Sequence, residues 1–280
     1  MPSVIAETLK ILEEKSPVSL QEVRVDDLVI GIFFTGVKLS TGHAGCAFTP
    51  IGEIPEAVCC PTSAARMPQA GDLEGKAVSE ILKYPLDPNV LKSAIGVATL
   101  NALSQLIIET DDGAKYQIIK DADGFDLLRI QPEETVSLIG AFGPYIHRLK
   151  MTGNPLFIIE KNPQTLRPDE MKFFKSEFEM PSALKKSDVI IITGTAIVNH
   201  TIDNILSFIT HGQRTAIIGP TASMIPDGFF KRGVHVIAGV RIKEPDLMIK
   251  ILKQGGSAYH LLKECSEKIA FLMPHSKGMK

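Results

Sequence analysis

Residues 188–195, DVIIITGT, decide the fold class: an unbroken run of Val and Ile ends abruptly in small and hydroxyl residues. Four further segments of the second half have the same character, and they are TVSLIGAF (135–142), LFIIE (156–160), TAIIGP (215–220) and VHVIAGV (234–240). Continuous aliphatic runs are typical of strands whose two faces are both covered. We therefore predict a sheet of about five buried, parallel strands.

Segments of helical character separate these strands and support the parallel arrangement. They are 145–151, 168–186, 201–210, 226–231 and 245–254. Strands that alternate with helices form parallel sheets with right-handed crossovers. The sequence thus predicts a Rossmann-like α/β domain over residues 131–280, and we expect the tail after Cys265 to fray.

The first half, residues 1–130, has a mixed α+β pattern. An amphipathic helix is predicted over residues 3–14, then a strand pair within residues 23–40 and a third strand from Ala44 until Pro50. Apolar residues recur at helical spacing over 73–83 and 89–108, and the second helix follows a capping Asp87 and Pro88. A polar passage at 113–124 marks the boundary with the second domain.

Charge is divided unevenly between these two predicted domains. Residues 1–130 carry a net charge of −7 and residues 131–280 a net charge of +5, which leaves the chain at −2. Such a total gives no indication of a nucleic-acid-binding surface. The asymmetry indicates docking of one domain on the other, or alternatively an anion site in the second domain.

The sequence predicts a cytoplasmic protein. Its N-terminus is acidic and lacks the basic start of a signal peptide, and no apolar run reaches the ~20 residues of a membrane helix. Among the four cysteines, Cys59 and Cys60 are adjacent and no CxxC pair occurs. This pattern is unlike a disulfide framework and favours a reducing compartment.

Ligands of open α/β sheets bind beyond the carboxyl ends of the strands, where the strand order reverses. At these positions the sequence places Gly140, Gly143, Thr193, Gly194, Thr195, Gly219, Pro220 and Thr221. Glycine allows close approach of backbone N–H groups, and threonine adds hydroxyl donors, so a phosphate, a carboxylate or a polar ring is the expected ligand. Asn199 and Thr201 follow in the same segment, and they exceed what capping one helix requires.

A dinucleotide cofactor is the main alternative. Glu160 ends the second strand about 20 residues after the first glycines, where a ribose-binding acid often lies. However, Phe142 and Tyr145 stand where the GxGxxG fingerprint needs glycine, and Pro144 lacks an N–H. Glu160 is equally well explained as a solvated charge at a strand end.

The first half contributes weaker candidates. Gly42 lies in a glycine-containing turn between the predicted strand pair and His43. His43 and Cys46 are residue types that bind soft metals, and Cys59 and Cys60 follow within fifteen residues. Their spacing matches no zinc module, and a buried cysteine also serves as a small hydrophobe. Asn101 is a polar residue within the small, apolar string of residues 95–103 and caps a loop or faces a ligand.

The strings TGTxxxNxT (193–201) and GPT (219–221), in this order, resemble the family described as "putative heavy-metal chelation". TGHAGCAFTP (41–50) and IGVATLNAL (95–103) resemble its first domain, which has an enolase N-terminal-like fold. The resemblance implies a ligand site between two domains, with residues 193–195, Asn199 and residues 219–221 on one wall. Residues 42–45 and Asn101 would lie near the other wall.

We therefore predict a protein that binds a small anionic or metal-associated ligand, with a link to metal uptake implied by the resemblance. The metal is expected as an ion or a complex, and oxygen donors around Glu160 suit a complex better than a bare soft cation. A ligase, lyase or transferase step stays open, and so does a homo-oligomer. The alternatives are an enzyme with a dinucleotide or adenosyl cofactor, and a non-catalytic assembly module.

Overall fold

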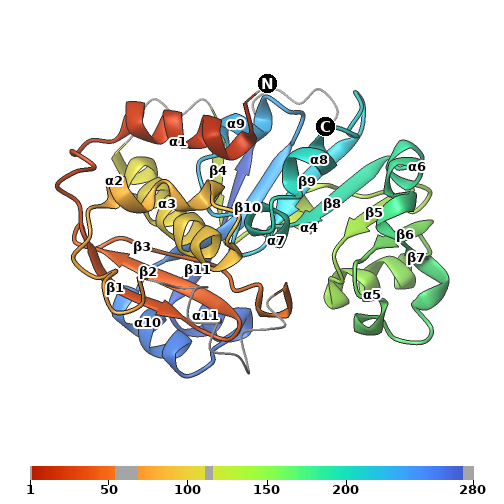
Figure 1. Cartoon of the computed structure of the whole chain (residues 1–280). Helices are drawn as coiled ribbons and strands as arrows, with labels where there is room; N and C mark the ends of the chain where they lie inside the picture. The colour runs from red at the N-terminus through yellow and green to blue at the C-terminus, as the bar shows by residue number, and fades with distance from the viewer. Residues whose placement is uncertain (1, 54–68, 111–115, 274–280) are drawn as a thin grey trace.

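The computed structural model describes residues 2–53, 69–110 and 116–273 (Figure 1). Its helices are α1 (Val4–Lys15), α2 (Val78–Ile81), α3 (Val90–Thr110), α4 (Gly124–Leu127), α5 (Gly143–Thr152), α6 (Met180–Lys185), α7 (Thr195–Val198), α8 (Ile202–Leu206), α9 (Asp227–Phe230), α10 (Pro245–Lys253) and α11 (Ala258–Glu264). Its strands are β1 (Val25–Ile30), β2 (Phe34–Leu39), β3 (Ala44–Phe48), β4 (Gln117–Lys120), β5 (Val136–Ile139), β6 (Leu156–Ile159), β7 (Phe174–Lys175), β8 (Val189–Thr193), β9 (Arg214–Ile218), β10 (Val236–Ile242) and β11 (Ser266–Leu272).

The fold is mixed α/β, as predicted, with one small antiparallel sheet and one large, mainly parallel sheet. The small sheet has the order β1-β2-β3, and the large one has the order β4-β11-β10-β9-β8-β5-β6-β7. All five strands expected in the second half are present. The six parallel strands β5 to β10 follow the order 3-2-1-4-5-6, which is the order of doubly wound nucleotide-binding sheets.

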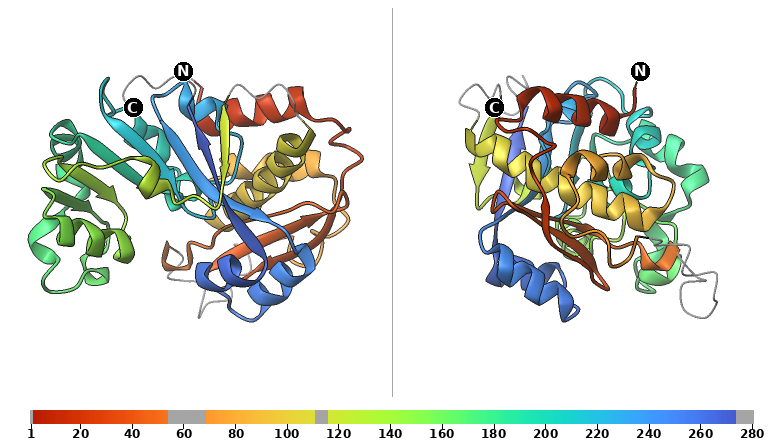
Figure 2. Two further views of the ribbon diagram at one scale, coloured as in Figure 1. Left: turned by 180° about the vertical axis from the view of Figure 1, so that it is seen from behind. Right: turned by 60° about the vertical axis from the view of Figure 1, so that its left-hand side comes forward.

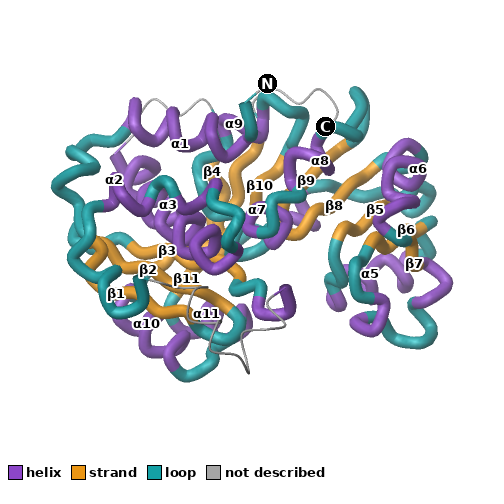
Figure 3. The backbone as a smooth tube through the Cα atoms, viewed as in Figure 1, coloured by secondary structure: helices purple, strands orange, loops and turns teal. Residues whose placement is uncertain are grey.

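Both faces of the large sheet are covered, which explains the continuous aliphatic runs. Along β8, Ile190 and Ile192 belong to the apolar cluster beneath α6, α7, α8 and α9, whereas Val189 and Ile191 belong to the cluster beneath α4 and α5. Figure 3 shows helices on both sides of this sheet. Every second side chain therefore enters a different core.

Helices also cover both faces of the small sheet, as the two views of Figure 2 show. α3 packs on one face against β2 and β3, and α10 packs on the other against β1 and β2. Two glycines permit these approaches: a Cβ at Gly45 would lie 2.3 Å from the Ala98 oxygen, and one at Gly36 would lie 2.7 Å from Leu252 Cδ1. A larger residue at Gly45 would clash with the backbone of α3, whereas one at Gly36 would have to displace the side-chain end of Leu252.

α3 is long and apolar enough to cross a membrane, contrary to the sequence-based expectation that no segment is. However, 78% of its most apolar window is buried inside the protein. Its hydrophobicity is explained by its position as a core helix, with the small sheet on one side and α1, α2 and α7 around it. No other helix in the described part of the chain meets this criterion.

Three further sequence-based expectations about the fold were wrong. Residues 266–272 do not fray but form β11, which is hydrogen-bonded to β10 and β4. Residues 168–186 are not one helix, because Phe174 and Lys175 pair with β6 and separate a 3₁₀ turn at Met171–Phe173 from a 3₁₀ turn at Glu177–Glu179 and α6. The helix expected over 73–83 is reduced to α2, because Gly75 has a φ of +78° and Ala77 is extended.

The predicted boundary near residue 130 stays a prediction. β4 precedes that boundary in the chain and yet lies at the edge of the large sheet, where it pairs with β11. α4 also precedes it and packs against β9 and β10. The large sheet therefore draws its elements from both halves of the chain.

Candidate functional site

The strand order reverses between β5 and β8, which are neighbours in the sheet although β6 and β7 separate them in the chain. Parallel strands bring their carboxyl ends to one edge of the sheet, so the loops after β5, β8 and β9 lie together. We call residues 140–143, 193–195 and 219–221, with Asn101 and Asn199, the carboxyl-edge site. The structure thus gathers most of the predicted ligand residues in one region.

The loop after β5 depends on Gly140. Its φ is +105°, and a Cβ there would lie 3.0 Å from both Cβ and Cγ2 of Thr193. Its N–H donates to the Ile159 carbonyl at 2.9 Å, so the turn is fixed to β6. In contrast, Gly143 begins α5 and has open space around its Cβ position. Only Gly140 is required by the geometry.

Thr193, Gly194 and Thr195 form a compact turn after β8. The Thr195 N–H donates to Thr193 Oγ1 at 3.3 Å, and the two threonine hydroxyl oxygens are 3.2 Å apart. The Gly194 N–H donates to the Ile218 carbonyl at 2.9 Å. Both threonines are half-buried, so their hydroxyl groups are ordered by local bonds and still accessible in part.

The loop after β9 links the large sheet to the small sheet through a hydrogen bond. Gly219 has a φ of +133°, and its N–H donates to the Ala238 carbonyl. Pro220 contributes its carbonyl oxygen, which accepts from Ser223 Oγ at 2.7 Å. Thr221 is buried, and its Oγ1 accepts from the Phe48 N–H at the end of β3 at 2.9 Å. The predicted Thr221 hydroxyl therefore has a structural bond between the two sheets.

Asn101 bridges the same two parts from α3 and is only 2% exposed. Its Nδ2 donates to the Cys46 carbonyl at 2.7 Å and to the Thr221 carbonyl at 3.0 Å. Because only the NH₂ group can donate, these two carbonyls fix the orientation of the amide. Asn101 Oδ1 is buried and has no hydrogen-bond partner among the described residues. A buried acceptor of this kind is satisfied by a donor, such as an ordered water or a group of a ligand.

Asn199 lies at the C-terminal end of α7 and caps the following turn. Its Oδ1 accepts from the Thr201 N–H at 3.3 Å and from Thr201 Oγ1 at 2.7 Å. Its Nδ2 lies 3.4 Å from Glu53 Oε1, and Lys161 Nζ lies 3.8 Å from the same oxygen. Sequence reasoning missed Glu53, because nothing in its local sequence indicates a partner 146 residues away.

Glu160 follows β6, and its carboxylate accepts hydrogen bonds from two loops. Its Oε2 accepts from the Ala141 N–H at 3.0 Å, and its Oε1 accepts from the Asn162 N–H at 3.1 Å. Both carboxylate oxygens are therefore used by backbone groups. This arrangement explains an acid at the strand end without a ribose, although the residue lies directly beside Gly140.

The two predicted metal ligands of the first half do not come together. His43 Nδ1 lies 3.0 Å from Thr41 Oγ1 and His43 Nε2 lies 3.2 Å from Glu109 Oε2, on the α3 side of the small sheet. Cys46 is three residues further along and joins the apolar cluster on the α10 side. Burial raises the pKa of the Cys46 thiol to about 12, so it stays protonated.

Gly42 occupies the turn before β3 with a φ of +82°, where it is exposed and a Cβ would meet no atom within 4 Å. Its role there is to allow the turn. Cys59 and Cys60 lie outside the described residues. Cys265 is buried near Cys46, and both are free thiols.

The donor atoms at the carboxyl edge do not fit direct chelation of a soft metal ion. Thiolates and imidazoles are the ligands that such ions prefer. No group of three or more His, Cys, Asp or Glu side chains capable of holding a metal occurs within residues 2–53, 69–110 and 116–273. Hydroxyl, amide and backbone groups dominate the site instead, and they suit an anion or a metal already held in a complex.

Comparison with known proteins places the chain in a family. Two family models, both described as "Putative heavy-metal chelation", match residues 123–271 and residues 14–104. An uncharacterized protein of Methanocaldococcus jannaschii is 25% identical over 195 residues, which cover 69% of this chain and 71% of that protein.

Two solved structures of proteins with unknown function from the DUF364 family share the fold. The one from Pyrococcus horikoshii has a TM-score of 0.74 at 21% identity and covers 95% of this chain and 99% of its own. The one from Desulfitobacterium hafniense has a TM-score of 0.71 at 17% identity and covers 96% of this chain and 98% of its own. The sequence-based recognition is confirmed: the chain belongs to the family described as "Putative heavy-metal chelation".

Proposed function

We propose that the protein binds a small anionic ligand, either free or as the shell of a metal complex, at the carboxyl-edge site. The observation that carries this proposal is the convergence of three loops rich in glycine and threonine at the reversal of strand order, together with Asn101 from α3. The hydroxyl groups of Thr193 and Thr195 supply donors there, whereas the N–H groups of the site glycines already donate to backbone carbonyls of the protein. The buried Oδ1 of Asn101 has no partner among the described residues and can accept from a hydroxyl group of the ligand.

In this proposal the heavy metal is part of the bound ligand and is not a cofactor held by the protein's own side chains. The family description supports a role in metal handling, while the donor atoms of the carboxyl-edge site are mostly neutral oxygen and nitrogen groups. A carboxylate-rich chelator that already holds its metal would present oxyanions to those donors. We further propose that this binding takes place in a reducing cytoplasm, consistent with the free thiols of Cys46 and Cys265.

Isothermal calorimetry and thermal shift with a defined panel test this proposal. The panel holds phosphate, citrate, Zn²⁺, Ni²⁺ and the citrate complexes of both metals. We expect stabilisation by an anion or a complex, and its loss in Thr195→Ala and Asn199→Ala. Ser207→Ala is the matched control, since Ser207 is exposed in the turn after α8 and bonds only locally, to the Asn204 carbonyl.

Two results would overturn the proposal. One is that no member of the panel raises the melting temperature or releases heat. The other is that the bare metal ions bind as well as their citrate complexes, and that both site variants bind like Ser207→Ala. The second result would move the metal to a thiolate or histidine site elsewhere in the chain.

A nucleotide or adenosyl cofactor is the second candidate, because the parallel strands follow the order 3-2-1-4-5-6. The occupied carboxylate of Glu160 and the missing N–H of Pro144 count against it. Calorimetry with NAD(H), NADP(H) and S-adenosylmethionine decides between the two candidates. Binding of any of these that is lost in Gly140→Ala would favour the cofactor.

A further inference from the structure

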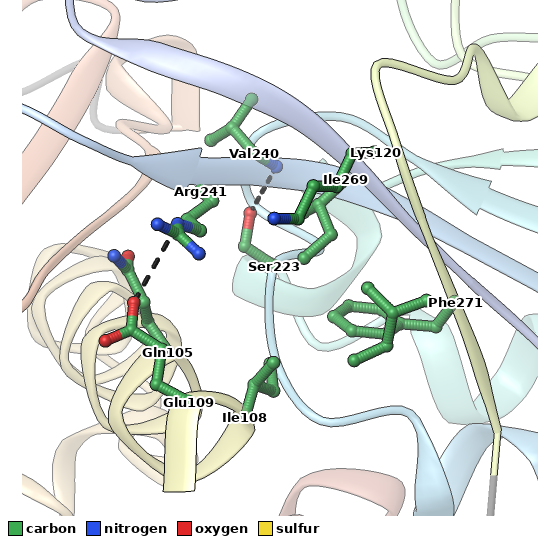
Figure 4. A pocket seen from close by; sticks show the side chains of 10 residues that line it. Gln105, Ile108, Glu109, Lys120, Ser223, Val240, Arg241, Ile269 and Phe271 are labelled. Carbon is green, nitrogen blue, oxygen red and sulfur yellow. Dashed lines mark hydrogen bonds and ion pairs between the residues drawn. The ribbon is translucent and has the colours of Figure 1, made fainter. Parts of the chain in front are cut away.

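A second pocket lies away from the carboxyl-edge site, between the last turns of α3 and the antiparallel part of the large sheet (Figure 4). Its volume is about 360 Å³, which lies within the range of about 300–1,000 Å³ that small-molecule sites have. None of the residues of the carboxyl-edge site lines it. It therefore needs an explanation of its own.

The register of three strands builds the floor of this pocket. Lys120 of β4 pairs with Ile269 of β11, and Ile269 pairs with Gly239 of β10, so the three residues form one row across the sheet. Ile118 and Phe271 form the adjacent row on the same face. Because Gly239 has no side chain, Ser223 can lie directly on the sheet, since a Cβ at Gly239 would lie 2.5 Å from Ser223 Oγ.

The lining is mainly apolar, with Ile108 of α3 facing Ile269 and Phe271 of the sheet in Figure 4. Ile118 of β4 also lines the pocket. Two polar residues of the lining are already saturated. Gln105 exchanges two hydrogen bonds with the Ile242 backbone, at 2.7 and 3.2 Å. Ser223 donates to the Pro220 carbonyl and accepts from the Val240 N–H. Neither is available to a ligand without loss of these bonds.

The two cationic side chains of the pocket, Arg241 and Lys120, differ in whether they have a carboxylate partner. Arg241 faces two carboxylates, with Nε 3.3 Å from Glu267 Oε1 and 3.8 Å from Glu109 Oε1, and Glu109 also faces His43. Arg241 Nε is buried and makes no hydrogen bond within the described chain. Lys120 is exposed and has no ion-pair partner among the residues described, and Figure 4 shows its ammonium group directed over the pocket.

We propose that this pocket is a second binding site, for a small monoanion with an apolar body such as a short-chain or aromatic carboxylate. The apolar walls of Ile108, Ile118, Ile269 and Phe271 bury the body of the ligand, and the ammonium group of Lys120 pairs with its anionic end. Burial of the apolar body supplies most of the affinity, since an exposed ion pair adds little.

Methyl NMR of the full chain, labelled at isoleucine δ1, tests the proposal with two probes of equal length, sodium hexanoate and hexan-1-ol. Three isoleucines report on the pocket, Ile108, Ile118 and Ile269, and Ile197 of α7 reports on the carboxyl-edge site. We expect hexanoate to move the three pocket signals saturably and to leave Ile197 in place. Hexan-1-ol should bind more weakly.

Lys120→Gln separates charge from shape. It should weaken hexanoate binding roughly two- to fivefold, the effect of an exposed ion pair, and leave hexan-1-ol unchanged. Lys185→Gln, at an exposed position of α6, is the matched control and should change neither. Ile118→Trp fills the pocket from an exposed strand position and should abolish both.

Three results would overturn the proposal. The first is that no pocket signal moves saturably with hexanoate. The second is that only Ile197 moves, which would assign the anion to the carboxyl-edge site. The third is equal binding of hexanoate and hexan-1-ol that Lys120→Gln does not change, because the pocket would then select only for apolarity.

Discussion

At the residue scale, Gly140 and Gly143 lie in one loop but under different constraints. Gly140 combines a φ of +105° with a Cβ position 3.0 Å from Thr193, whereas Gly143 has neither a positive φ nor a close neighbour. An added methyl group would therefore strain the first position and fill open space at the second. Comparison of these two positions therefore separates a conformational requirement for glycine from a preference for a small residue.

We predict that Gly140→Ala lowers the free energy of unfolding by about 1–3 kcal/mol, because a left-handed φ and a crowded Cβ both oppose it. Gly143→Ala should change it by less than about 0.5 kcal/mol, since alanine suits a first helical position. Urea denaturation of both variants measures the difference. Equal stabilities would contradict the described turn.

Asn101 is the second residue whose chemistry is fixed by its partners. Its amide NH₂ group faces the carbonyls of Cys46, in β3 of the small sheet, and of Thr221, in the loop after β9 of the large sheet. We predict that Asn101→Ala costs about 1–3 kcal/mol, because two carbonyls lose their donor. Asn101→Asp should cost more at neutral pH, since a carboxylate would face both carbonyls.

Urea denaturation at pH 7 gives the order of the three proteins, which we expect to be wild type, then Asn101→Ala, then Asn101→Asp. An aspartate variant as stable as the wild type would contradict the assigned donation from Asn101 Nδ2 to the two carbonyls.

At the element scale, β11 holds the antiparallel side of the large sheet together. Its Phe271 is fully buried, and its ring lies edge-on to Tyr116 with 5.6 Å between the ring centroids. We predict that Phe271→Ala costs about 3–5 kcal/mol. Tyr259→Ala, at a position of α11 that is 68% exposed, is the control and should stay within about 0.5 kcal/mol of the wild type.

The junction of β9 and β10 should respond to pH through His235. Burial, together with the nearby charge of Arg214, lowers the pKa of His235 below its ordinary value, and its Nδ1 accepts from the Thr215 N–H at 3.3 Å. The unfolded chain therefore binds the proton more readily than the folded protein does. The contribution of His235 to stability is fully present above about pH 6.5 and is lost as the pH falls below that value.

His235→Gln removes this contribution. The stability difference between wild type and His235→Gln should therefore shrink as the pH is lowered from about 7.5 to about 5. Ser207→Ala, at an exposed position and without loss of a titratable group, should follow the wild type in parallel. A constant difference for His235→Gln over this range would show that its folded pKa is not lowered.

At the scale of the whole molecule, ion pairs connect the acidic first half to the basic second half. Lys231 and Arg232 both reach Glu7 of α1 at 2.6 Å, and Lys253 reaches Asp27 of β1 at 3.1 Å. Such contacts favour docking as the reason for the charge asymmetry. Each exposed pair adds little to stability, so the apolar core shared by both halves contributes more.

The sequence predicted those parts of the fold that depend on local pattern. The aliphatic runs from Val136 to Val240 all became strands, because burial on both faces leaves a continuous apolar signal. β11 was missed because Glu267 and Lys268 interrupt its apolar pattern, and its place is decided by pairing with β10 and β4. Long-range pairing of this kind leaves no local signal.

The same distinction holds for the candidate site. Glycines and threonines at strand ends could be identified because topology brings such ends together. The partners of Asn101, and the contact between Asn199 and Glu53, depend on packing between distant segments and could not be read from the sequence. The opposite orientations of His43 and Cys46 likewise required the register of β3.

Native mass spectrometry of the freshly purified protein, with elemental analysis of the same sample, tests the central claim most directly. We predict that the wild type retains a small anion or a metal complex, that Asn199→Ala and Thr195→Ala lose it, and that Ser207→Ala keeps it. A wild-type protein that carries a bare metal ion, equally present in both site variants, would contradict the carboxyl-edge site as the place of binding.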